Sequence, residues 1–111
     1  MSRPADIGPL GEVTCVQGES FVVSGPDGDI QPGGDQGLYV RDTRFLNHLE
    51  LMIDGERPRT LSGRVVRAAA ATFYAYAPRD DDRGVDPTLL VTRRRLVDGS
   101  LHEEVAIDNR A

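Results

Sequence analysis

T-L-L-V-T-R-R-R-L-V-D-G-S-L-H-E-E-V-A-I, residues 88–107, is the stretch that decides the fold. Two runs rich in β-branched and other apolar residues, 88–97 and 100–107, flank Asp98-Gly99. An Asp-Gly pair between such runs is a strong hairpin signal, because both residues tolerate the positive φ of a type I′ turn. The stretch therefore predicts two antiparallel strands joined by a two-residue turn.

Charge and apolar pattern fix the expected register of this hairpin. A two-residue turn places Arg94 opposite Glu103 and Arg93 opposite Glu104, so each pair is oppositely charged. Most apolar residues then share one face, which holds Leu90, Thr92, Leu96, Leu101, Val105 and Ile107. A turn longer by one residue would scatter these apolar residues over both faces, so the two-residue turn is favoured.

Further strands and turns are expected toward the N-terminus. The short extended runs are residues 13–16, 20–23, 38–40 and 45–53, and Asp54-Gly55 follows the last of them as a second hairpin turn. In the run 45–53 the residues alternate, which puts Phe45, Leu49 and Ile53 on the expected core face. Residues 65–77 begin with alanines that favour a helix and continue as T-F-Y-A-Y, and we favour a strand.

These elements predict an all-β fold, an antiparallel β-sandwich of short hairpins with little helix. We expect residues 1–11 to form an N-terminal tail and residues 12–111 to form one β-sandwich module. The acidic, proline-bounded residues 78–87 are expected to be a solvated loop. A chain of 111 residues has the size of a single domain.

Composition narrows the class of protein. Hydrophobic residues make up 39% and charged residues 28%, which is typical of a globular chain. A net charge of −5 disfavours a nucleic-acid partner, since phosphate binding needs clustered positive charge. No apolar run is long enough to cross a membrane, and the first residues do not resemble a signal peptide. With Cys15 as the single cysteine, we expect a cytoplasmic protein without a disulfide.

A motif series from residue 15 to residue 62 resembles a known family. Gly18, Phe21 and Val23 precede Gly28-Asp29-Ile30, and the segment G-L-Y-V-R-D-T-R-F-L, residues 37–46, follows. This order is similar to the N-terminal domain of bacterial glycogen debranching enzyme-like proteins of the amylo-α-1,6-glucosidase type. Gly37, Asp42, Thr43 and Arg44 are the motif residues that we expect to be structural. The resemblance covers most of the chain, but only about the first half of that family's domain, so we expect a fragment.

The resemblance implies an accessory β-module in α-glucan metabolism. In this family hydrolysis belongs to a separate (α/α)-barrel domain, which would be the partner, in the same or a longer polypeptide. No catalytic residue, cofactor or metal is therefore expected in this chain. Two alternatives stay open: a glycan-binding module for an α-glucan, and a β-domain that self-associates through the edge of its last strand.

Individual residues support these alternatives unequally. Tyr74 and Tyr76 lie on one face of a strand and are the possible glycan contacts. Asp42 lies between two arginines, which would lower its pKa and make it a poor general acid. Other residue types that could suggest a metal or a nucleophile are interpreted as turn, surface or core residues; they are Asp27, Asp29, Asp35, His48, His102 and Cys15.

Overall fold

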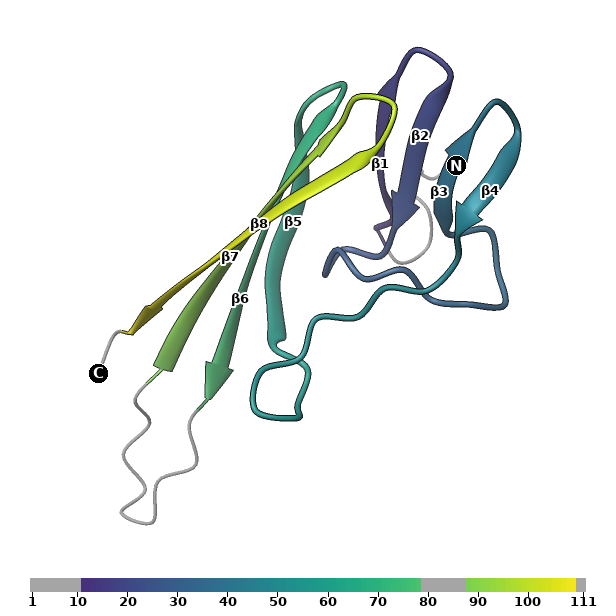
Figure 1. Cartoon of the computed structure of the whole chain (residues 1–111). Coiled ribbons are helices and arrows are strands. Elements are labelled where there is room, and N and C mark those ends of the chain that lie inside the picture. The colour runs from purple at the N-terminus through teal and green to yellow at the C-terminus, as the bar shows by residue number, and fades with distance from the viewer. Residues whose placement is uncertain (1–10, 79–87, 110–111) are drawn as a thin grey trace.

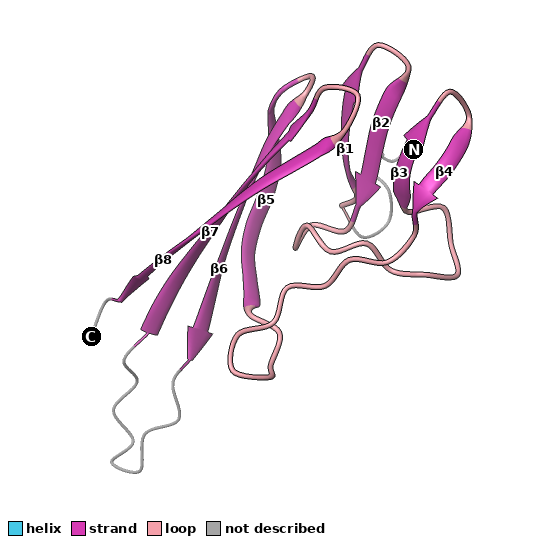
Figure 2. Cartoon of the chain, viewed as in Figure 1, coloured by secondary structure: helices cyan, strands magenta, loops and turns pink. Residues whose placement is uncertain are grey.

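The computed structural model describes residues 11–78 and 88–109. Within these residues the chain forms two antiparallel four-stranded sheets and no helix (Figure 2). The all-β prediction is confirmed, and the two stacked sheets give a sandwich-like fold. The expected tail (apart from Gly11) and the expected loop (apart from Pro78) lie outside the described residues.

Each sheet is a meander in which neighbouring strands follow one another in sequence. The first sheet consists of β1 (Val13–Gln17), β2 (Ser20–Ser24), β3 (Gly37–Val40) and β4 (Thr43–Leu46). The second consists of β5 (Arg59–Arg67), β6 (Ala70–Pro78), β7 (Thr88–Val97) and β8 (Leu101–Asn109). Short turns suffice for most connections, because antiparallel neighbours need no crossover.

The first sheet packs on one end of the second (Figure 1). Strand β1 contacts β5, β6 and β7, and β2 contacts β7, whereas β4 lies farthest from the second sheet. We call the face of the second sheet that is turned toward the first sheet the inner face, and the opposite one the outer face. Only part of the inner face is covered, since the free end of β8 extends away from the first sheet (Figure 1).

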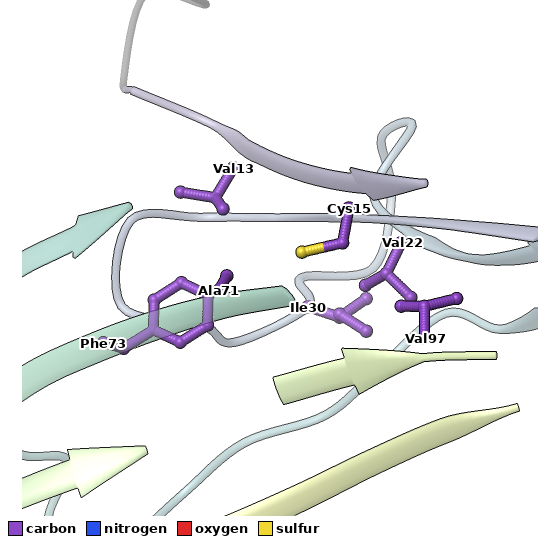
Figure 3. Packing of buried hydrophobic residues seen from close by; sticks show 7 residues of the cluster. All are labelled: Val13, Cys15, Val22, Ile30, Ala71, Phe73 and Val97. Carbon is purple, nitrogen blue, oxygen red and sulfur yellow. The ribbon is translucent and has the colours of Figure 1, made fainter. Parts of the chain in front are cut away.

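An apolar cluster joins the two sheets (Figure 3). Its buried members come from both sheets and from the connection after β2; they are Val13, Cys15, Val22, Ile30, Ala71, Phe73 and Val97. Gly63 of β5 lets the turn after β2 approach closely, because a Cβ at this position would collide with the carbonyl oxygen of Pro26. Cys15 is buried here as a small apolar side chain, as its place in a strand predicted.

The register of the β7–β8 hairpin differs from the prediction by one residue. Val97 pairs with Leu101, and Arg94 lies opposite Glu104 rather than Glu103. A two-residue type I′ turn needs positive φ at both central residues, but only Gly99, with φ of 91°, adopts it. The chain instead closes with three residues, and the Asp98 N–H donates to the Ser100 carbonyl at 3.1 Å.

This shift moves every β8 side chain to the opposite face. Leu101, Val105 and Ile107 therefore accompany Val91 and Val97 on the inner face and not Leu90 and Leu96 as predicted. The burial of Val91 and Val97 explains the choice. The shift also brings Glu103 inside, opposite Arg95.

The predicted strand 45–53 is also wrong beyond Leu46, where β4 ends. The chain then crosses toward the second sheet and is held at single points, such as the bridge of Leu49 with Ile30. Phe45, expected in the core, is 67% exposed.

The turn at Asp54-Gly55 is confirmed, with φ of 54° and 81°. In the segment 65–77 the strand interpretation holds for β5 and β6, although a turn at Ala68 and Ala69 divides them.

Candidate functional site

Strand β7 carries two arginines into the space between the sheets. Arg93 and Arg95 are only 3% and 2% exposed, and they alternate with the exposed Arg94. They share the inner face with Val91 and Val97, which are almost fully buried. Because burying an unpaired guanidinium is very unfavourable, each of these arginines must find partners inside the protein.

Arg93 bridges the two layers. Its Nη1 donates to Oδ1 of Asp29 at 2.7 Å, and its Nε donates to Oε1 of Glu103 at 2.9 Å. The same Nη1 lies 3.3 Å from the carbonyl oxygen of Asp27. A strand of the second sheet is thereby tied to the connection that follows β2.

Arg95 repeats this arrangement one step along the strand. Its Nε donates to Oε2 of Glu103 at 2.5 Å, and its Nη2 donates to the carbonyl oxygen of Gly28. Its guanidinium lies 4.8 Å from the centroid of the Phe73 ring, a cation–π contact. Burial lowers the pKa of Arg95, and the negative charge of Glu103 opposes that shift. Its Nη1 is buried without a hydrogen-bond partner in the part of the chain that the structure describes.

Arg57 lies at the solvent-exposed end of this network. Its guanidinium lies 3.1 Å from Asp27 and 3.5 Å from Asp29, and the backbone N–H of Leu51 donates to Asp29 at 3.1 Å. We call the whole set the ionic seam; it comprises Asp27, Asp29, Arg57, Arg93, Arg95 and Glu103. Its three arginines balance its three carboxylates, and Glu50, 3.9 Å from Arg57, adds a further carboxylate beside this set.

The ionic seam is not built for hydrolysis. Glycoside hydrolysis needs two carboxyl groups about 5–9.5 Å apart with a sugar between them. Here Arg93 lies between Asp29 and Glu103 and bonds to both. The adjoining cavity, lined by Asp29, Phe73 and Arg93 among others, has a volume of about 10 Å³. Such a volume holds about one water molecule, so no sugar can enter.

A serine, a histidine and an aspartate also meet at the β7–β8 turn. His102 Nε2 lies 2.9 Å from Oδ1 of Asp98 and 3.1 Å from Oγ of Ser100. A catalytic triad needs the aspartate on Nδ1 and the serine on Nε2, so that the proton can cross the ring. Both partners here share one nitrogen, and the three side chains stabilise the turn instead.

The residues considered for a metal are held in other ways. Asp27 and Asp29 bond to arginines, whereas Asp35 lies apart and its carbonyl accepts a hydrogen bond from the Tyr39 hydroxyl. His48 Nε2 is 3.8 Å from Glu50. Among the described residues, no group of three or more His, Cys, Asp or Glu side chains could hold a metal ion.

The family-motif residues gather at the β3–β4 hairpin. Gly37 begins β3, where a Cβ would lie 2.5 Å from the Leu46 carbonyl oxygen. Asp42 is in the turn with φ of 68°, next to Thr43 at the start of β4. Arg44 donates to the carbonyls of Gly34 and Gln36 at 2.6 and 3.2 Å and so holds the preceding loop. Asp42 itself is exposed at the surface.

Tyr74 and Tyr76 lie on the outer face of the second sheet, half-buried. Across the strands, Tyr74 pairs with Ser62 and Thr92, and Tyr76 pairs with Arg59 and Leu90. Tyr74 thus has polar neighbours on both sides, whereas Tyr76 has the apolar Leu90 on one side. The glycan-binding alternative predicts exposed rings beside polar side chains, and both rings are half-buried.

Sequence reasoning missed the ionic seam. It paired arginines with glutamates but used the pairs only to select the register of the hairpin. The sequence does contain a signal for it. Val91, Arg93, Arg95 and Val97 are spaced two residues apart, so the arginines share one face of the strand with the two valines. Only the placement of Asp29 and Glu103 shows that this side is the buried one.

Comparison with known proteins identifies the family. No curated protein and no solved structure matches the chain significantly. None of the described residues lies in a helix long and apolar enough to span a membrane. The sequence model for the N-terminal domain of some glycogen debranching enzymes matches residues 15–111, nearly the whole chain. This protein therefore belongs to the family of N-terminal domains found in glycogen debranching enzymes.

Proposed function

We propose that the chain is a non-catalytic N-terminal β-domain of a glycogen debranching enzyme-like α-1,6-glucosidase. It packs on a separate (α/α)-barrel catalytic domain, in the same or a longer polypeptide, and shapes access to it during α-glucan metabolism in the cytoplasm. The family match over residues 15–111 is the observation that carries this proposal. The closed ionic seam supports it, because its carboxylates, the buried Asp29 and the partly exposed Asp27 and Glu103, are engaged by arginines.

A surface suited to such packing lies on β8. Val105 and Ile107 are 40% and 53% exposed on the inner face, beyond the part that the first sheet covers. Within the described residues β8 pairs on one side only, with β7. We call these two side chains and the adjoining strand edge the β8 strip. Exposed apolar side chains beside an open strand edge favour contact with another protein surface.

Two measurements test this function. The purified chain should release no glucose from a branched α-glucan limit dextrin, and it should bind an (α/α)-barrel debranching domain in sedimentation experiments. A Val105→Lys and Ile107→Lys double variant should weaken that binding, while Val16→Lys, at an equally exposed valine of β1, should not. Glucose release that Asp42→Asn abolishes would contradict the proposal.

The same experiment separates the self-association alternative. A chain that forms dimers through the β8 strip and ignores the catalytic domain would support a self-associating β-domain instead. In that case the double lysine variant would be monomeric, and the Val16→Lys variant would still dimerise.

A further inference from the structure

The outer face of the second sheet is hollowed near the β5–β6 and β7–β8 turns. The hollow has a volume of about 450 Å³. Sites for small ligands usually measure about 300–1,000 Å³, so the space is large enough for part of an oligosaccharide. Its lining includes Arg95 and Glu103 of the ionic seam, whose charged groups bond to each other on the inner face. The hollow is about 45 times larger than the cavity of about 10 Å³ beside Asp29 and Arg93.

Rows of side chains cross this face at right angles to the strands. The first row is Ala70, Leu96 and His102, and the second is Thr72, Arg94 and Glu104; both line the hollow. The third row places Ser62, Tyr74 and Thr92 side by side. Successive rows lie two residues apart, about 6.6 Å along each strand. The first row is apolar at Ala70 and Leu96 and polar at His102, and the second row is polar. The third row carries the Tyr74 ring next to the residues that line the hollow.

Arg94 and Glu104 of the second row are accessible to a ligand, whereas Thr72 is only 9% exposed. Arg94 and Glu104 form an ion pair of 3.4 Å, with side chains 58% and 74% exposed. A surface pair of this kind contributes little to stability. A sugar hydroxyl both donates and accepts hydrogen bonds, so it can bond to the carboxylate and the guanidinium at once. Arg64, opposite Thr72, and Arg67, in the lining of the hollow, add further hydrogen-bond donors to this face.

We propose that this outer face binds the α-glucan chain itself, with Arg94 and Glu104 as hydrogen-bonding groups and Tyr74 as the ring against which a sugar packs. The ligand class rests on the proposed function, because it is the glucan of the debranching reaction. The site is distinct from the β8 strip, whose apolar side chains point to the inner face. The two surfaces allow the domain to contact an enzyme and a glucan simultaneously.

Binding of the full chain to glycogen tests this inference. In native gels that contain glycogen, and in calorimetry with maltoheptaose, the chain should bind, and cellohexaose should not compete. Arg94→Ala and Tyr74→Ala should each weaken binding about tenfold, the loss of one charged hydrogen bond or one apolar contact. Arg94→Lys, which retains the charge without the guanidinium fork, should be intermediate.

The matched control is Arg41→Ala. Arg41 also forms an exposed ion pair, with Glu19 at 3.0 Å, but on the first sheet. Its replacement should leave glycogen binding unchanged, and thermal unfolding should show that all variants are folded.

A chain that does not bind glycogen, or whose binding is insensitive to Arg94 and Tyr74, overturns the inference. If the outer-face variants weaken binding to the catalytic domain instead, this face is a protein interface. Intact binding to the catalytic domain in the same samples would leave the proposed function standing.

Discussion

Two neighbouring parts of the inter-sheet space are stabilised by opposite chemistry. In the apolar cluster, Val22, Ile30 and Val97 exclude water by packing. In the ionic seam, Arg93 and Arg95 are buried almost as deeply, yet they bond to carboxylates and backbone carbonyls, and Arg95 also lies over the Phe73 ring. Both parts use the same face of β7. A charged side chain can therefore be buried as deeply as an apolar one, provided that partners of opposite charge lie beside it.

The two parts should respond differently to substitution. An apolar cluster loses packing in proportion to the space that is vacated. An ion pair between buried groups loses more when one partner is removed, because the other remains as an uncompensated charge. The experiments below sharpen this contrast, beginning with the largest expected effect.

Asp29→Ala should be the most destabilising change. It removes the carboxylate that accepts hydrogen bonds from Arg93 and from the Leu51 N–H. We expect a loss of about 3–5 kcal/mol in the free energy of unfolding, the usual consequence of breaking a buried pair. Urea unfolding measures it. Glu19→Ala, which breaks the exposed pair with Arg41, is the control and should cost about 1 kcal/mol or less. Equal effects of the two variants would mean that the seam is solvated.

Ile30→Ala tests the apolar cluster. Ile30 is fully buried, and its backbone pairs with Leu49 whatever its side chain. The expected loss is about 2–5 kcal/mol, from lost transfer free energy and a residual cavity. Ile107→Ala, at an exposed isoleucine of β8, should change the same unfolding curve far less. A larger effect at Ile107 would show that the β8 strip is buried in solution.

A smaller effect should appear at alkaline pH. It should arise at Cys15, where the apolar cluster meets Arg95 of the ionic seam. Burial raises the pKa of the Cys15 thiol, and the charge of Arg95 opposes this shift. Above about pH 8.5 the unfolded chain loses the thiol proton while the folded chain retains it. The folded state then binds more protons, so the free energy of unfolding falls as the pH rises.

A Cys15→Ala variant isolates the contribution of the Cys15 thiol to the pH dependence of stability. The stability advantage of the parent chain over the variant should be constant up to about pH 8 and should shrink above it. A difference that stays constant to pH 10 would mean that Cys15 ionises as readily in the folded chain as in the unfolded one.

The sequence predicts the all-β class and many of the strands, because local signals specify them. Asp54-Gly55 forms the expected turn, since both residues adopt positive φ. The strands around Gln17-Gly18 follow from short β-branched runs and a turn residue. Each of these features depends on residues that are close in the chain.

The features that were mispredicted depend on residues far apart in the chain. The Glu103 side chain turns to the inner face because Arg93 and Arg95 need a partner there, and Asp29 comes from the connection after β2, 64 residues from Arg93. Phe45 alternates like a core residue but is exposed, because β4 lies at the edge of the first sheet, away from the second. Hairpin signals are local, whereas the identity of the buried face depends on how the sheets stack.

Adjacent glutamates on β8 offer the most direct test of the whole account. Both residues line the outer-face hollow, but the carboxylate of Glu103 bonds to Arg93 and Arg95 of the ionic seam, whereas that of Glu104 pairs with Arg94 on the outer face. We would measure both the free energy of unfolding and the glycogen affinity of Glu103→Gln and Glu104→Gln. Glu103→Gln should lower the free energy of unfolding by about 3 kcal/mol and leave the glycogen affinity of the folded chain unchanged. Glu104→Gln should lower the glycogen affinity and leave the free energy of unfolding nearly unchanged. Stability that depends on Glu104, or glycogen affinity that depends on Glu103 in the folded chain, would contradict the assignment of the inner face to structure and the outer face to function.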